Sequence, residues 1–282
     1  MRKTIYTIAL LLGLQVSQTA QAQNEQVTLY VPNFVRPLVE KWVAEYKKTN
    51  DQVDFQFKSG KLQDNEPNSI SFVTDGNDGV FFARYAVLPV TMKRSKAAER
   101  IASQRFNAKK LKELFFVKDQ EQDASTVQKF HIYTGNSLTS ASRLYAAYFG
   151  EVPVDYKGKK ISGDDSFLNV AISRDPLGVT INSLSNIFNL ESRQLREDLA
   201  LLPLDLDKQG REVLGEGCLD DIITLLEHQH YSEIPVGNAG LVYNHDNALL
   251  RDFVQWILTQ GTQYVHQYGL MQLPSKDLAQ NK

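Results

Sequence analysis

The sequence predicts a mixed α/β fold built on a parallel sheet. Residues 27–31 are rich in β-branched and aromatic side chains, and an amphipathic stretch with apolar residues at helical spacing follows at 34–46. Residues 53–57 alternate as in a half-buried strand. Strand, helix and strand in this order form the βαβ pattern of a parallel sheet. Between the first strand and the helix, Asn33 suits the N-cap, because its side-chain oxygen can accept a bond from a free backbone N–H group.

The remainder of the chain continues the alternation of strands and helices. Residues 70–73 and 80–82 predict two strands joined by a polar turn, and the second run continues to residue 90, long enough to cross between two lobes. Further strands are expected at 130–133, 179–182 and 240–243, and helices at 107–116, 141–149, 166–173, 219–228 and 249–264.

The first 22 residues have the three parts of a secretory signal peptide. Arg2 and Lys3 precede an apolar run at 8–14, and the small residues Ala20 and Ala22 predict cleavage after Ala22. The run is shorter than the roughly 20 residues that a membrane-spanning helix needs, and no later segment is apolar enough. The sequence therefore predicts a periplasmic protein that is not embedded in a membrane.

Charge and size limit the possible partners and domains. The whole chain has 282 residues, which permits one large domain or two of ordinary size. Removal of Arg2 and Lys3 leaves 29 of its 31 basic residues against 33 acidic ones, so the net charge is near −4. This balance argues against a nucleic-acid partner, and any bound anion has to be held locally.

The order of the segments resembles the phosphate-binding proteins of bacterial ABC importers, which belong to the periplasmic binding protein superfamily. The likeness is carried by residues 33–38, 84–90, 106–115, 134–139, 220–235 and 253–265. The resemblance implies a two-lobed type II fold with two crossovers, in which 23–88 and 236–282 form lobe I and 89–235 form lobe II. It also implies capture of phosphate or a similar oxyanion by hinge closure, and delivery to an ABC-type membrane permease.

The resemblance places the anion site at turns that follow strands in both lobes. Carried over by position, the ligand-binding residues are Asn33, Phe34, Ser59, Asp75, Ser137, Leu138 and Thr139. A helix N-terminus offers unpaired N–H groups and about half a positive charge, so it can hold an oxyanion in a chain without net basicity. Ordinary helix caps and turns use the same residue types. Arg36 and Arg143, near the starts of the two helices, could add charge to the site or lie on the surface.

Two positions depart from the family pattern. The family has an arginine before the second-lobe turn and a glycine after its serine, where this chain has Tyr133 and Leu138. A bidentate charged partner for the anion is therefore missing, unless Tyr133 replaces it. The alternative hypothesis is an interaction module of the cell envelope that keeps the fold but has lost or changed its ligand.

Residues 205–216 have the spacing of a calcium-binding loop. Oxygen-bearing side chains fall at Asp205, Asp207, Gln209 and Glu216, and Gly210 stands where such loops turn sharply. An acidic surface loop is the other interpretation. The sequence contains no nucleophile elbow, zinc-protease motif or phosphate-binding P-loop, so we expect no enzyme, no catalytic residue and no cofactor.

Overall fold

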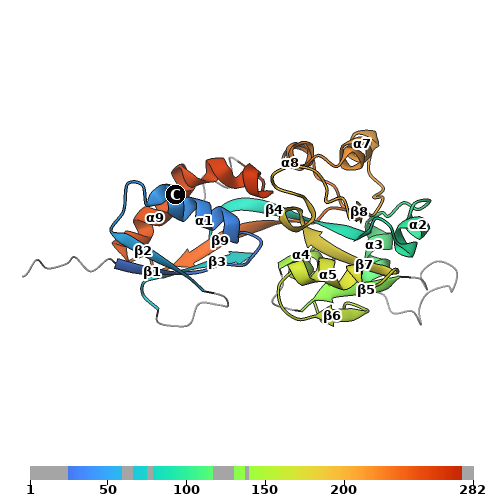
Figure 1. Cartoon of the computed structure of the whole chain (residues 1–282), viewed down its shortest axis with the longest axis horizontal. Coiled ribbons are helices and arrows are strands. Elements are labelled where there is room, and N and C mark those ends of the chain that lie inside the picture. The colour runs from blue at the N-terminus through green and yellow to red at the C-terminus, as the bar shows by residue number, and fades with distance from the viewer. Residues whose placement is uncertain (1–24, 59–65, 75–78, 117–129, 137–139, 275–282) are drawn as a thin grey trace, which may run out of the picture.

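The computed structural model describes residues 25–58, 66–74, 79–116, 130–136 and 140–274, and shows two α/β lobes joined by two long strands (Figure 1). The expected signal peptide lies outside the described residues. The sheet has the strand order β2-β1-β3-β9-β4-β7-β5-β6, with β8 paired to β4. The first four strands of this order belong to lobe I and the last three to lobe II, and β4 runs through both.

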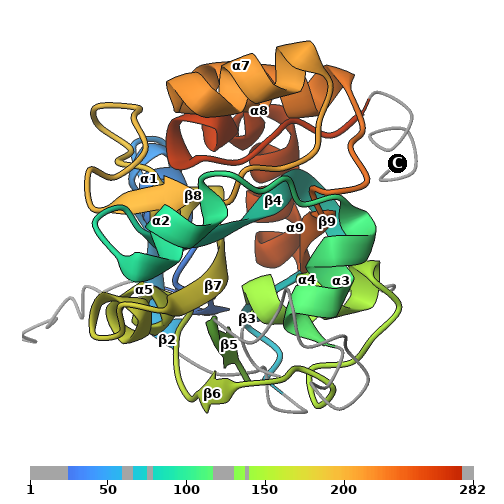
Figure 2. The same cartoon turned by 90° about the vertical axis from the view of Figure 1, so that its right-hand side faces the viewer.

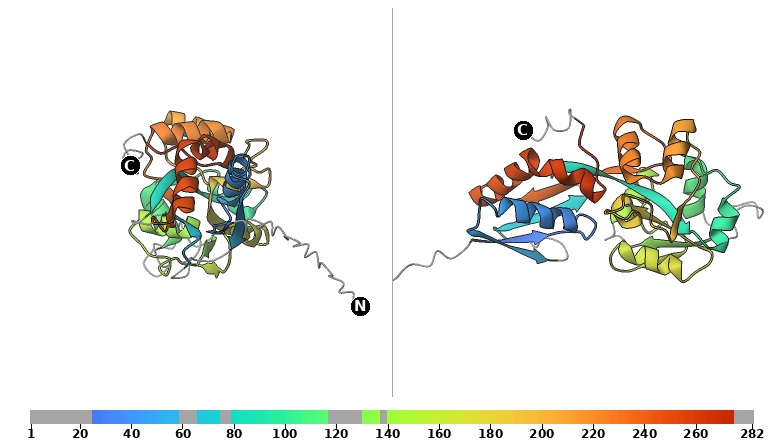
Figure 3. Two further views of the ribbon diagram at one scale, coloured as in Figure 1. Left: turned by 90° about the vertical axis from the view of Figure 1, so that its left-hand side faces the viewer. Right: turned by 45° about the horizontal axis from the view of Figure 1, so that its top comes forward.

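Lobe I contains the two ends of the described chain. Its elements are β1 (Glu25–Tyr30), α1 (Arg36–Tyr46), β2 (Val53–Lys58), β3 (Ser69–Thr74), β9 (Val236–Tyr243), α9 (Ala248–Thr259) and the 3₁₀ helix η2 (Gly261–Tyr268). α1 and α9 lie on the same face of the sheet, as the two views in Figures 1 and 3 show. The buried indole of Trp42 packs between them and the sheet, where it contacts the ring of Phe82 edge-on at 5.0 Å.

Lobe II is formed by the middle of the chain. Its elements are α2 (Lys96–Ile101), α3 (Ala108–Phe115), β5 (His131–Gly135), α4 (Ser140–Tyr148), β6 (Lys159–Ile161), α5 (Ser166–Ser173), β7 (Gly178–Ser183), α6 (Leu184–Ile187), β8 (Leu199–Leu201), α7 (Lys208–Glu216) and α8 (Leu219–His228). Seen end-on, α7 and α8 lie on one side of β4, and α5 and β6 on the other (Figure 2).

The long strand β4 (Val80–Met92) changes its partner midway. Up to Ala86, which lies opposite Val236, it pairs with β9. From Val87, which lies opposite Ser183, it pairs with β7 instead. The junction between the lobes therefore falls at this exchange of partners, and β9 returns to lobe I beside it.

The carboxyl ends of the parallel strands in the two lobes point toward each other. β9 leaves the junction at Val236 and is antiparallel to β3, so β3 and its parallel neighbours β1 and β2 run toward lobe II. β7 ends at the junction with Ser183 and is parallel to β5, so both run toward lobe I. The carboxyl ends of β1 and β5 consequently face each other across the junction.

The helix expected at 249–264 is broken in the structure. α9 ends at Thr259 and η2 begins at Gly261. A Cβ at Gly261 would lie 2.9 Å from the indole nitrogen of Trp42, which donates a 2.7 Å bond to the Gly261 carbonyl. Close approach of the backbone to this indole accounts for the glycine at the break.

Candidate functional site

The first-lobe half of the site is the turn between β1 and α1. The Pro32 carbonyl accepts bonds from the N–H groups of Val35 (3.2 Å) and Arg36 (3.1 Å). None of the described residues accepts a bond from the N–H groups of Asn33 and Phe34. These two donors, at the carboxyl end of β1, are suited to an oxyanion.

The side chains of this turn differ from the sequence-based expectation. Asn33 is exposed but is not the N-cap, because α1 begins at Arg36 and its N-cap, Val35, makes no side-chain capping bond. Phe34 is buried, with its ring 5.1 Å from that of Tyr85. Phe34 therefore anchors the turn in the core, and only its backbone can contact a ligand.

The second-lobe half of the site is the start of α4, where a buried carboxylate is bound. Asp165 is 4% exposed, and its Oδ2 accepts a 3.0 Å bond from the Ala141 N–H group in the first turn of α4. The Ser142 hydroxyl accepts a 2.7 Å bond from the Gly135 N–H group at the end of β5. A negative charge of the protein itself thus interacts with the positive end of the α4 dipole.

Asn182 holds Asp165 in place. This fully buried side chain, on β7, donates from Nδ2 to the Asp165 carbonyl (2.8 Å) and to the Asn169 Oδ1 (3.2 Å). Its Oδ1 accepts bonds from the Ser183 N–H group and from Asn186 Nδ2, both at 2.9 Å. Because each Asn182 polar atom is bonded, the position of Asp165 is tightly defined.

Neither Asp165 nor Asn182 was expected from the sequence as a site residue. Asp165 immediately precedes α5, so its local pattern is typical of a cap for that helix, yet it makes no side-chain capping bond there. Asp164 does this instead, since its Oδ1 accepts a 2.9 Å bond from the Ser166 N–H group. Two successive aspartates precede this helix, and only one of them is needed as its cap. This pair was the signal in the sequence that Asp165 could bind elsewhere.

Tyr133 does not replace the family arginine. Its hydroxyl donates a 2.8 Å bond to Asp175 Oδ2, which also lies 2.7 Å from His131 Nδ1. Asp175 precedes β7 and lies at the amino ends of β5 and β7, opposite to the carboxyl ends that face lobe I. Burial and the bond to Asp175 raise the pKa of Tyr133. The phenol is therefore neutral and directed away from the candidate site.

The other expected site residues are placed only in part. Ser59, Asp75, Ser137, Leu138 and Thr139 lie outside the described residues. Arg36 forms a 2.8 Å ion pair with Glu40 and lies over the ring of Phe57, and Arg143 is exposed. The described half-sites therefore rely on backbone donors and helix termini for positive potential.

The calcium-loop interpretation of residues 205–216 is wrong. Asp207 is the N-cap of α7, and its Oδ1 accepts a 2.7 Å bond from the Gly210 N–H group. Asp205 precedes this cap, Gln209 lies inside the helix and Glu216 ends it. With a rise of about 1.5 Å per residue, Asp207 and Glu216 are about 13 Å apart and do not share an ion. Among the described residues, no group of three or more His, Cys, Asp or Glu side chains could hold a metal.

Comparison with known proteins places the fold. No protein-family model and no curated protein matches the sequence. Solved structures do match. The first is a phosphate ABC transporter substrate-binding protein with bound phosphate from Clostridium perfringens, with a TM-score of 0.60 and 11% identity over 89% of this chain and 100% of the other. The second is an ABC-type phosphate transport receptor from Vibrio cholerae, with a TM-score of 0.59 and 12% identity over 88% and 100%.

The chain has the type II periplasmic binding protein fold. PstS from Borrelia burgdorferi also shares it, with a TM-score of 0.50 and 12% identity over 89% of this chain and all of the other. The two-lobed α/β fold expected from the sequence is thus confirmed. No helix in the described ranges is both long and apolar enough to cross a membrane.

Proposed function

We propose that this protein is a periplasmic solute-binding protein that holds phosphate or a similar oxyanion between its lobes and delivers it to an ABC-type membrane permease. The observation that carries the proposal is the opposition of the carboxyl ends of β1 and β5 across the junction, where each strand is the element before a helix in the chain. In open α/β sheets, ligands bind beyond the carboxyl ends of the strands.

Three further features support an oxyanion as the solute. No described residue accepts a bond from the N–H groups of Asn33 and Phe34, so both groups can donate to a ligand. α4 is a nine-residue helix whose N-terminus faces the same junction. A protein of the same fold was solved with phosphate bound. Backbone donors and helix dipoles can hold such a ligand in a chain whose net charge is negative.

One observation favours the second candidate function, an interaction module of the cell envelope. Asp165 already accepts a bond from the first turn of α4, and the side chain at the arginine position, Tyr133, is bonded to Asp175. Each of these contacts weakens the attraction of lobe II for an anion. A protein with this arrangement could use the outer surfaces of its lobes to bind a partner instead.

A thermal-shift and calorimetric titration separates the two functions. The purified protein is titrated with phosphate, sulfate and molybdate, and a bound ligand raises the melting temperature because it binds only the folded state. The Ser137→Ala/Thr139→Ala variant removes the expected hydroxyl ligands. Its matched control is Ser173→Ala/Thr259→Ala, which removes two exposed hydroxyls from the ends of α5 and α9.

The proposal predicts that phosphate stabilises the wild type and the control, and that this stabilisation is lost in the Ser137/Thr139 variant. An equal shift in all three proteins would refute the assignment of these two residues. The absence of any shift with all three anions would refute oxyanion binding and favour the interaction module.

A further inference from the structure

The C-terminal segment, residues 261–273, is bonded to both lobes. In lobe I the Gly261 carbonyl accepts the bond from the Trp42 indole, and Lys41 of α1 lies over the ring of Tyr264 at 5.2 Å. The segment then passes along β4, where the backbones of Met271 and Arg84 exchange two bonds of 2.9 Å. It therefore forms a third connection between the lobes beside the strands β4 and β9.

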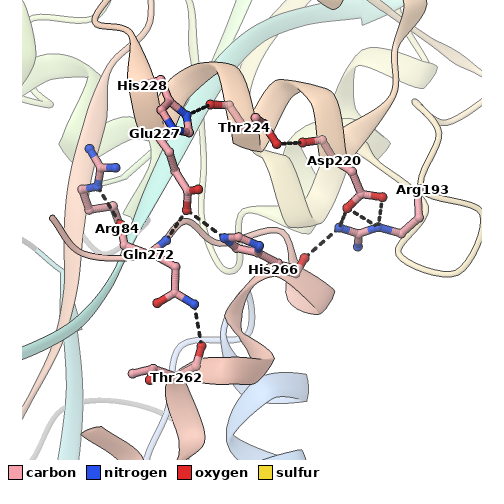
Figure 4. A network of polar contacts seen from close by, with 9 residues as sticks. All are labelled: Arg84, Arg193, Asp220, Thr224, Glu227, His228, Thr262, His266 and Gln272. Carbon is pink, nitrogen blue, oxygen red and sulfur yellow. Dashed lines mark hydrogen bonds and ion pairs between the residues drawn. The ribbon is translucent and has the colours of Figure 1, made fainter. Parts of the chain in front are cut away.

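On the lobe II side, the guanidinium of Arg193 holds the end of η2. Arg193 lies between α6 and β8, and it donates to the carbonyls of His266 (2.7 Å) and Gln267 (2.9 Å). Asp220 at the start of α8 binds the same guanidinium at 2.6 Å (Figure 4). A cation at the C-terminal carbonyls of a helix is favourable, because the negative end of the helix dipole lies there.

A second pair of bonds lies about two turns farther along α8. The Glu227 Oε1 accepts a 2.7 Å bond from His266 Nε2 and a 2.6 Å bond from the Gln272 N–H group. Arg84 of β4 donates from Nε to the Gln272 carbonyl at 3.0 Å. We call the set Arg193, Asp220, Glu227, His266 and Gln272 the clasp (Figure 4).

One partner in each clasp ion pair is largely buried, whereas Asp220 and His266 are 58% and 43% exposed. The side chains of Arg193 and Glu227 are 20% and 17% exposed, so their bonds are screened less than those of surface ion pairs. The backbone φ of Arg193 is 59°, a value that residues other than glycine rarely adopt. Its bond to Arg193 lowers the pKa of Asp220, so this carboxylate stays charged at neutral pH.

The clasp and the second-lobe half of the candidate site, at the start of α4, lie on opposite sides of the strands that join the lobes. In Figure 1, α8 and the C-terminal segment lie above β4, whereas α4 and α5 lie below it. A rotation about β4 and β9 that brings α4 closer to lobe I must increase the distance between α8 and η2. Closure of the lobes therefore stretches the clasp.

We propose that the clasp is a latch that opposes closure of the lobes, so that the empty protein is held open until a solute offsets the latch. The latch rests on the proposed function for the nature of the solute, and it adds to that function a control of the hinge. The apparent dissociation constant of a solute is its intrinsic value divided by the fraction of protein that is competent to bind. A weaker latch consequently raises affinity without any change in the site.

The interlobe distance tests the latch without any ligand. Spin labels are introduced by Lys48→Cys in lobe I and Lys208→Cys in lobe II, in a Cys218→Ser background, because both lysines are exposed. Arg193→Gly removes the guanidinium and suits the positive φ, and Glu227→Ala removes the other anchor. The control, Arg196→Ala, removes an ion pair with Asp198 that lies within lobe II.

Double electron–electron resonance should show a second, closed distance that is populated more in each clasp variant than in the wild type and the control. Identical distributions in wild type and both folded clasp variants would overturn the latch. Phosphate is then titrated, and we expect a dissociation constant at least about threefold lower in the clasp variants. A distance shift without phosphate binding in any protein would support the latch and refute the proposed solute. Phosphate binding with the same distances and affinities in all proteins would support the proposed solute and refute the latch.

Discussion

Removal of the Asp165 charge is expected to strengthen anion binding. The carboxylate accepts the Ala141 N–H group at 3.0 Å and is 4% exposed, so an oxyanion bound at the start of α4 shares this helix terminus with it. If the two charges lie about 5 Å apart, they repel by about 3 kcal/mol at an effective dielectric constant of about 20, and by about half that at 40. Asp165→Asn removes this repulsion but keeps a side-chain oxygen for Ala141. The phosphate dissociation constant should therefore fall by about tenfold to a hundredfold.

Isothermal titration calorimetry with phosphate, at low and at high salt, measures this change. Asp164→Asn is the matched control, because it changes the net charge equally but removes a carboxylate that binds the Ser166 N–H group of α5. A gain in affinity in Asp165→Asn alone would support an anion at the start of α4. Equal gains in both variants would show that only net charge matters, and an unchanged dissociation constant in Asp165→Asn would refute the reasoning.

Three other substitutions test the fold and its charges. Trp42→Phe leaves the buried Gly261 carbonyl without its donor, so urea unfolding should show a loss of about 1–3 kcal/mol; an unchanged midpoint would contradict this role of the indole. A Cβ at Gly158, where φ is 84°, would lie 2.2 Å from a carbonyl oxygen of β5, so Gly158→Ala should lower the melting temperature or prevent folding, and a stable variant would disprove the clash. The hydrogen bond from Arg193 lowers the pKa of Asp220, and the resulting stability is present above about pH 4 and lost as the pH falls through the lowered pKa. Asp220→Asn should make the free energy of unfolding less dependent on pH below about 4, and an unaltered slope would refute the assignment.

Local patterns were sufficient for most of the main elements. The strand expected at 53–57 corresponds to β2, and the helices expected at 166–173 and 219–228 have the bounds of α5 and α8. The apolar residues of β2 alternate in sequence, and the buried residues of α5 and α8 recur three and four apart, so the signal is contained in about ten neighbouring residues. The crossing strand β4 was also expected, because its apolar run is too long for an ordinary strand.

Features that depend on contacts distant in the sequence were not predicted. The break before η2 follows from the approach of Gly261 to Trp42, 219 residues away. Asp165 binds Ala141, 24 residues earlier, although its neighbours in sequence belong to α5. For residues 205–216 the sequence allowed a calcium loop or an acidic surface loop, because the same Asp207 that caps α7 also fits the ligand spacing. A local pattern of oxygen-bearing side chains does not distinguish a cap from a cation ligand.

The position of β9 in the sheet has a consequence for synthesis of the chain. β9 is the strand between β3 and β4, and with α9 and η2 it comes from the last part of the sequence. The elements of lobe II are continuous in sequence and can fold as one unit before the last part of the chain is available, because domains generally fold as units. The first strands of lobe I must wait for a central strand made some 160 residues after β3. Until β9 is in place, the edges of β3 and β4 that will pair with it are unpaired, and such edges can pair with another chain and aggregate.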